Sequence, residues 1–140
     1  MPRATATREL PASREAIWAI IAEPRRFAEW WPRVAVVRPD RLGLAEGSRW
    51  AVESTERPLV FRRSGYSGAL VVHGVEPPKR FAWALTGDRI DAELRLEEAG
   101  SDRTRAVLEV SAAWLVPLPR ALPRRALVRL HNICQNGSST

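Results

Sequence analysis

The alternation of apolar and polar residues between Val34 and Leu115 constrains the fold of this chain more than any other feature. Turn-forming segments such as Pro77-Pro78 and Gly87-Asp88 interrupt the alternation. A period of two between such turns is typical of half-buried β-strands. The pattern predicts strands at 33–38, 47–55, 58–65, 68–76, 79–86, 89–97 and 104–115. Connections this short cannot cross over a sheet, so we expect an antiparallel meander.

The two faces of the predicted sheet differ in chemistry. One face is charged, with Asp91, Glu93 and Arg95 at alternate positions of a single strand. An antiparallel sheet with this pattern has one face in water and the other covered by the rest of the chain. The covered face is assigned to Trp50, Val52, Phe81, Trp83, Leu85, Ile90, Ala92, Leu94, Leu96, Leu108, Val110, Ala112 and Trp114.

Helical signals flank the meander on its N-terminal side. Residues 4–9 read as a short first strand that stops at Pro11. Ser13 is a plausible N-cap for a helix that bears an apolar stripe and should end before Pro24. A second short helix fits Arg25 to Trp30, and Pro32 closes it.

The C-terminal segment predicts one long amphipathic helix at 118–136. Apolar residues recur at spacings of three and four, and Asn136-Gly137 is a typical stop signal. Pro123 is tolerated only in a first turn, so the regular helix could begin as late as Leu122. The apolar stripe holds Leu118, Leu122, Ala126, Leu130 and Ile133, and the polar side holds Arg120, Arg124, Arg125 and Arg129.

Composition bounds the class of protein. The chain has 140 residues, six of them tryptophan, and a formal net charge of +6. This length fits a single domain, 1–140. The segment 117–140 contains arginines and no acidic residue, so most of the net charge belongs to the last helix. The rest of the chain is nearly balanced, and we therefore expect no specific nucleic acid partner.

The single cysteine and the N-terminus point to a reducing compartment. Cys134 is the only cysteine, which excludes an intrachain disulfide and a cysteine-based zinc site. The N-terminus lacks the apolar core of a signal peptide, and no apolar run reaches the length of a membrane span. We expect a cytoplasmic protein without a transmembrane segment, as a monomer or weak homodimer.

The N-terminal motifs resemble those of a known superfamily. Leu10-Pro11-Ala12-Ser13, Glu15, Ile17-Trp18, Glu23-Pro24, Phe27 and Trp30-Trp31-Pro32 resemble the polyketide cyclase/dehydrase and lipid-transport branch of the START/SRPBCC (birch-pollen-allergen-like) superfamily. The segment from Val75 to Phe81 is similar to that family's turn before a middle strand.

The resemblance implies a fold and a cavity. The fold would be an α+β helix-grip fold, a curved antiparallel sheet of about seven or eight strands wrapped around a long C-terminal helix, with two short helices after the first strand. Between sheet and helix, members of the superfamily hold an apolar or amphipathic small molecule.

The apolar strand face would then line the cavity, although the same residues could instead form an ordinary core. Trp30 and Trp31 lie where the family has its cavity opening. One of them is expected to be half exposed as a gate, unless the pair only caps the helix. The expected cavity residues are Phe27, Trp30, Trp31, Trp50, Val52, Phe81, Trp83, Leu94, Leu108, Trp114, Leu122 and Leu130.

Polar residues near the fourth and fifth predicted strands are the candidates for orienting or reacting with a ligand. They are Tyr66, His73, Arg62 and Arg63, with Ser64 beside them. His73 faces the cavity only if residues 69, 71, 73 and 75 point inward, and the pattern leaves this register open. A pairing of Cys134 with His131 is possible on a helix, but a buried cysteine is usually inert.

Enzyme signatures are otherwise missing from the sequence. It contains no phosphate loop, no G-x-S-x-G and no H-E-x-x-H, and its two histidines are a poor metal set. We expect no metal and no cofactor. The leading hypothesis is binding of a hydrophobic or amphipathic small molecule, lipid or polyketide-like. The alternatives are a polyketide aromatase/cyclase and an interaction protein whose Arg-rich last helix docks on an acidic partner, an anionic membrane or RNA.

Overall fold

The computed structural model describes residues 2–54, 68–87, 89–113, 118 and 120–138. The strand predicted at 58–65 lies outside these residues. In chain order the elements are β1 (Arg3–Leu10), α1 (Arg14–Ile21), the 3₁₀ turn η1 (Pro24–Arg26), α2 (Phe27–Trp30), β2 (Val34–Arg38), β3 (Arg49–Ser54), β4 (Gly68–Glu76), β5 (Arg80–Leu85), β6 (Ile90–Gly100), β7 (Arg103–Ala112) and α3 (Leu122–Ser138).

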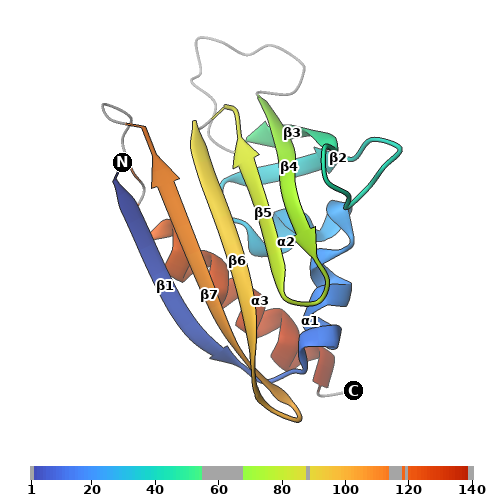
Figure 1. Ribbon diagram of the computed structural model, residues 1–140, viewed down its shortest axis with the longest axis vertical. Helices are drawn as coiled ribbons and strands as arrows, with labels where there is room; N and C mark the ends of the chain where they lie inside the picture. Colours follow the sequence, from blue (N-terminus) through green and yellow to red (C-terminus); the bar gives the residue numbers. More distant parts are fainter. Residues whose placement is uncertain (1, 55–67, 88, 114–117, 119, 139–140) are drawn as a thin grey trace.

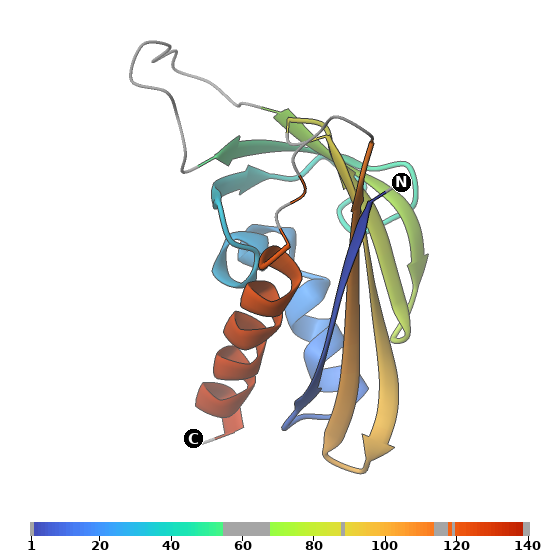
Figure 2. The same ribbon diagram turned by 90° about the vertical axis from the view of Figure 1, so that its left-hand side faces the viewer.

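The described strands form one antiparallel sheet. Their order is β1-β7-β6-β5-β4-β3-β2, so the first strand closes one edge beside the last and the meander runs to the other edge. The sheet is curved, and all helices lie on one of its faces (Figures 1 and 2). Figure 1 shows α3 crossing behind β7 and β6, while α2 lies behind β5. The expected α+β helix-grip fold is confirmed.

Local signals explain where the N-terminal helices begin and end. Ser13 has extended backbone geometry, and its Oγ accepts a hydrogen bond from the Ala16 N–H at 3.2 Å. This bond satisfies one of the free amides at the start of α1 and confirms the predicted N-cap. Pro24 opens η1, where a missing N–H does no harm. The second short helix is thus a 3₁₀ turn followed by one α-helical turn.

Proline sets the start of α3, but glycine does not set its end. The helix begins at Leu122 with Pro123 in its first turn, as predicted. It continues to Ser138, past the predicted end at 136, because glycine is tolerated in a helix although it disfavours one. Within the described residues, no helix is both long and apolar enough to cross a membrane.

The core lies between the apolar face of the sheet and the helices. Thr104 and Ser48 are the fully buried polar residues of the described chain. The Thr104 Oγ1 donates a hydrogen bond to the backbone oxygen of Ala12 at 2.8 Å, which ties the start of β7 to the link between β1 and α1. The other fully buried residues of the described chain have aliphatic or aromatic side chains or are Cys134.

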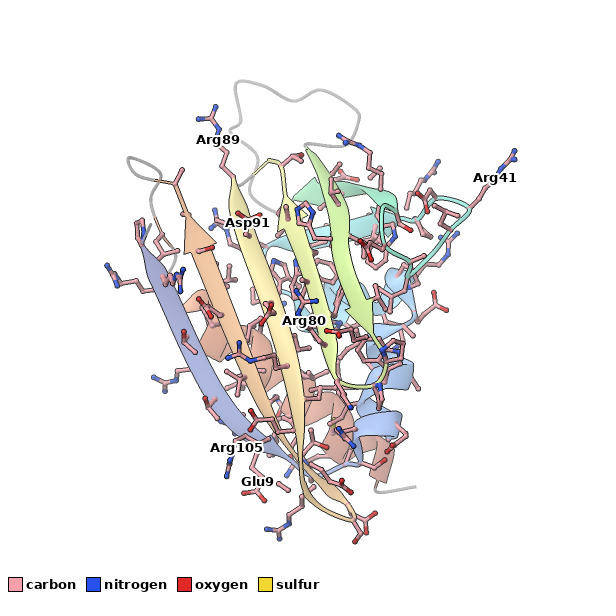
Figure 3. The ribbon with its side chains drawn as sticks, in the orientation of Figure 1. Glu9, Arg41, Arg80, Arg89, Asp91 and Arg105 are labelled. Carbon is pink, nitrogen blue, oxygen red and sulfur yellow. The ribbon has the colours of Figure 1, made fainter. Side chains whose placement is uncertain are left out.

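The opposite face of the sheet carries ion pairs. The guanidinium of Arg80 lies 3.0 Å from a carboxylate oxygen of Glu93 and 3.3 Å from one of Glu76. These contacts raise the pKa of Arg80, with the Glu93 hydrogen bond as the largest cause. Glu93 also accepts from Arg95 at 2.9 Å. Figure 3 shows Arg80 on this outer face, with Asp91 near the start of β6.

Candidate functional site

Six aromatic rings form one cluster between the sheet and α2, called here the aromatic cluster. In the cluster Phe27 stacks on Trp31 with ring centroids 5.5 Å apart, and Phe81 stacks on Trp83 at 4.4 Å. Trp31 and Trp83 meet edge to face at 5.2 Å, which joins the helix rings to the strand rings. The members are Phe27, Trp30, Trp31, Trp50, Phe81 and Trp83.

The expectation of a half-exposed tryptophan gate is wrong. Trp30 is 1% and Trp31 0% exposed. The reason is that β5 presents Trp83 to both rings, at 5.8 and 5.2 Å, while Phe27 covers them from α2. These tryptophans therefore belong to the packed interior.

The indole N–H groups of the cluster differ in how they are satisfied. Trp50 Nε1 donates to the backbone oxygen of Gly43 at 2.8 Å. Gly43 lies in the loop between β2 and β3, where its positive φ of 62° suits a glycine. The Nε1 atoms of Trp30, Trp31 and Trp83 are buried and have no hydrogen-bond partner among the described residues.

The Asp40 carboxylate holds the loop that serves Trp50. It accepts hydrogen bonds from the N–H groups of Arg49 at 2.8 Å, Leu42 at 3.0 Å and Gly43 at 3.2 Å. Together these bonds lower the pKa of Asp40, with Arg49 as the largest cause. The loop is therefore pinned by a charged group at the surface while its carbonyl reaches the interior.

The remaining expected cavity residues take part in the same core. Val52, Leu94, Leu108, Leu122 and Leu130 are all buried. Trp114 lies outside the described residues. Contact of this set with a ligand stays a prediction.

His73 does not face the interior. Leu70, Val72 and Gly74 are the buried residues of β4, and a β-bulge lies between Val72 and Gly74. The His73 side chain is 54% exposed, and its Nε2 lies 3.9 Å from Asp91 Oδ1. The inward register considered for His73 is therefore wrong. The other polar candidates, Tyr66, Arg62, Arg63 and Ser64, lie outside the described residues.

A shallow hollow on the outer face surrounds His73. Its volume is about 280 Å³. The polar side chains of this hollow are mostly charged and lie over Ala82, on the face that water reaches. The lining includes His73, Ala82, Asp91, Glu93, Glu109 and Ser111. No group of three or more potential metal ligands occurs in the part of the chain that the structure describes.

A larger hollow lies between α1 and the last turns of α3, called here the α1–α3 groove. Its volume is about 490 Å³, within the range of small-molecule sites. The wall is mostly apolar, with a carboxylate and a hydroxyl at its rim. The residues are Pro11, Ala12, Ser13, Ala16, Ile20, Asp102, Ile133 and Cys134.

Sequence reasoning missed this groove. Its only local signal is the small side chain of Ala16 in front of Ile20 on the same side of α1, with another small residue, Ala12, just before the helix. Small residues on a helix leave room beside a neighbouring helix. The neighbour, however, comes from the far end of the chain, which no local pattern identifies.

Cys134 connects the groove to the core and behaves as an apolar residue. It is buried and lines the groove. Burial raises the pKa of its thiol, an effect that the nearby charge of Arg26 partly opposes. His131 Nδ1 lies 3.3 Å from the backbone oxygen of Glu9. The thiol therefore stays protonated near neutral pH, and nothing here activates it as a nucleophile.

The outer side of α3 is basic. Arg124, Arg125 and Arg129 are exposed. None of the three forms an ion pair with an acidic residue of the described chain. The predicted charge pattern of the last helix is thus present as a solvent-facing surface.

Solved structures with this fold span nearly the whole chain. Protein XoxI from Bacillus cereus aligns with a TM-score of 0.73 at 10% identity, covering 99% of both chains. A conserved protein from Geobacillus kaustophilus has a TM-score of 0.71 at 12% identity, covering 97% of both. A START superfamily protein from Mycobacterium smegmatis has a TM-score of 0.65 at 18% identity, covering 96% of this chain and 97% of the other.

The sequence also matches a family model directly. No curated protein matches it closely. Residues 1–131 match the family described as polyketide cyclase/dehydrase and lipid transport. The match spans β1 through most of α3, in agreement with the resemblance first seen in the N-terminal motifs. The chain therefore belongs to the polyketide cyclase/dehydrase and lipid transport family.

Proposed function

We propose that the protein binds one hydrophobic or amphipathic small molecule, lipid or polyketide-like, on the helical side of its sheet. The observation that carries this proposal is the α1–α3 groove, an apolar hollow of about 490 Å³ that meets the core at Cys134. Affinity for an apolar molecule follows from removing its surface from water. Membership of a family described by polyketide and lipid chemistry supports the same ligand class.

The groove and the aromatic cluster have different roles in this proposal. The groove would be the place where the ligand enters, because it adjoins the core: Ala12, Ile20 and Ile133 pack against the core, and Cys134 belongs to it. The body of the ligand would rest on the rings of the aromatic cluster, which are at most 2% exposed in the described structure and would have to move apart to admit it. Aromatic rings offer large apolar area with few rotatable bonds, so they lose little entropy on binding.

Fluorescence titration with N-phenyl-1-naphthylamine, an uncharged apolar probe, tests the proposal. We expect saturable binding at one molecule per chain. Ala16→Trp should weaken it at least tenfold by filling the groove. Ala19→Trp is the matched control, because Ala19 is an exposed residue of the same helix outside the groove. Absence of saturable binding, or equal binding by both variants, would contradict the proposal.

A polyketide cyclase activity finds less support in the described residues. Ring closure of a polyketide needs a group that moves a proton inside the pocket. His73, the one described candidate, lies on the outer face. Arg62, Arg63 and Tyr66 remain proposed catalytic groups, and loss of turnover in Tyr66→Phe with ligand binding intact is the result that this hypothesis needs.

The basic side of α3 supports a second candidate function, docking on an anionic surface. Exposed cations without an acidic partner attract anions over about one Debye length. Binding to vesicles that contain phosphatidylglycerol should be strong at low salt and should be lost when Arg124 and Arg125 are replaced by glutamate. Binding that is independent of salt would argue against this function.

A further inference from the structure

The aromatic cluster contains three hydrogen-bond donors that the described fold does not use. Trp30, Trp31 and Trp83 are 1%, 0% and 1% exposed, so water does not reach their N–H groups. Their Nε1 atoms have no acceptor in the ranges that the structure describes. A buried donor without a partner is rare in folded proteins and unfavourable, and three neighbouring ones call for a physical reason.

Trp50 shows that the same cluster can satisfy an indole when an acceptor is provided. Its Nε1 donates to the Gly43 carbonyl at 2.8 Å, and Asp40 holds the loop that carries this carbonyl. A backbone segment thus comes to one edge of the cluster. The other three indoles pack edge to face against one another, with ring centroids 5.2 to 5.9 Å apart.

We infer that the ligand of the proposed function carries an uncharged carbonyl oxygen that the indole N–H groups of Trp30, Trp31 and Trp83 orient. The inference rests on the proposed function and names the chemistry of its ligand. A carbonyl oxygen has two lone pairs and accepts from two donors at once, so two of the three N–H groups can bond it together. No ring of the cluster is charged, and Arg33, which lies two residues after Trp31 with its Nε buried, already has an interaction of its own, so a carboxylate buried there would lack a cation from the cluster to compensate it.

The rival account is that each indole N–H points at a neighbouring ring face. The ring planes of Trp30 and Trp31 meet at 90°, and those of Trp30 and Trp83 at 88°, so edges do meet faces. Such N–H to ring contacts are weaker than a bond to oxygen. If they satisfied the donors, a ligand oxygen would gain nothing from them.

Calorimetric titration with three compounds of one shape separates the two accounts. The compounds are 2-acetylnaphthalene, which has a carbonyl, 2-isopropenylnaphthalene, in which a CH2 group replaces the oxygen, and 2-naphthoate, which is charged. The variants are Trp31→Phe and Trp83→Phe, which keep a ring and remove the N–H. Trp50→Phe is the matched control, because the N–H that it removes is already bonded to Gly43.

The measured quantity is the ratio of ketone to hydrocarbon affinity within each variant, which cancels the effect of the smaller ring. In the unmodified protein we expect a ratio of roughly five, the net value of one hydrogen bond. The ratio should fall from about five toward one in Trp31→Phe or Trp83→Phe and stay near five in Trp50→Phe. Cooperative thermal unfolding of each variant checks that it is folded.

The outcomes distinguish this inference from the proposed function. If the hydrocarbon binds and the ketone gains nothing, the inference fails and the proposed function stands. The same holds if the ratio is equal in all variants, or if 2-naphthoate binds most tightly. If none of the three compounds binds and N-phenyl-1-naphthylamine does not either, the proposed function fails and takes the inference with it.

Discussion

The two faces of the sheet share strands β4 to β7 but differ in how their polar groups are satisfied. On the outer face, Arg80 lies between Glu76 and Glu93, and Glu93 also binds Arg95. On the inner face, two buried indoles of the cluster, Trp31 and Trp83, have N–H groups without an acceptor in the described chain. The charged groups around Arg80 thus bond to one another, whereas the inner face has N–H donors that no described acceptor satisfies.

This difference indicates where function should be sought. A surface ion pair contributes little to stability and recognises nothing by itself. An uncharged interior with spare donors favours an apolar ligand that brings an acceptor. Substitutions that remove one group at a time, from either face or from the loop at the sheet edge, test this difference.

The largest expected effect is loss of a ring from the inner face. Trp31→Ala should lower the free energy of unfolding by about 3 to 5 kcal/mol, because it leaves a cavity among Phe27, Trp30 and Trp83. Denaturation in urea measures this. A change below 1 kcal/mol would mean that the cluster is not packed as described.

A smaller effect is expected where the interior does satisfy a polar group. Thr104→Val removes the hydroxyl that bonds the Ala12 carbonyl at 2.8 Å while keeping the shape of the side chain. The free energy of unfolding should fall by about 1 to 2 kcal/mol, since a buried carbonyl loses its partner. Thr5→Val, at an exposed position of β1, is the control and should change it little.

On the outer face, loss of a central ion pair should matter less. Glu93→Gln weakens the contacts with Arg80 and Arg95, whose side chains are 36% and 45% exposed. The expected loss of unfolding free energy is about 1 kcal/mol or less, and it should shrink further in high salt. A loss as large as that of Trp31→Ala would remove the distinction between the two faces.

The smallest expected effect is a contribution to stability that disappears in acid. The pKa of Asp40 is below its ordinary value of 3.8, chiefly because the Arg49 N–H bonds the carboxylate. The folded protein thus holds that proton less tightly than the unfolded chain. Its contribution to stability is present above the ordinary pKa and is lost as the pH falls below 3.8.

The free energy of unfolding of Asp40→Asn should therefore differ from that of the unmodified protein at neutral pH. The two values should converge as the pH falls below 3.8. Urea denaturation at a series of pH values measures this. A difference that persists unchanged at low pH would show that the Asp40 charge does not hold the loop.

The sequence predicted most of the fold because local chemistry decides it. Ser13 caps α1 by itself, and Pro123 marks the start of α3 whatever surrounds it. Alternation identified the inner residues of β5 to β7, because one set of alternate positions in these strands is apolar and the other set is largely polar or charged. Gly137 was a weaker signal, since a helix can continue through a glycine.

The site was less predictable because it depends on contacts between distant segments. In β4 the residues at odd and at even positions are both largely apolar, so alternation does not show which of them face the core. Only the pairing of β4 with β3 and β5 decides that His73 faces outward. Burial of Trp30 and Trp31 depends on rings of β5, fifty residues away in the chain. The α1–α3 groove joins the two ends of the sequence, and its small residues look ordinary when taken alone.

The most direct test of the central claim is the nitrogen–proton spectrum of protein labelled with ¹⁵N-tryptophan, titrated with N-phenyl-1-naphthylamine. Single Trp→Phe variants assign the indole signals. The account predicts that the signals of Trp30, Trp31 and Trp83 move and saturate at one molecule of probe per chain. If the probe binds and these three signals do not move, the ligand does not occupy the inner face and the account is contradicted.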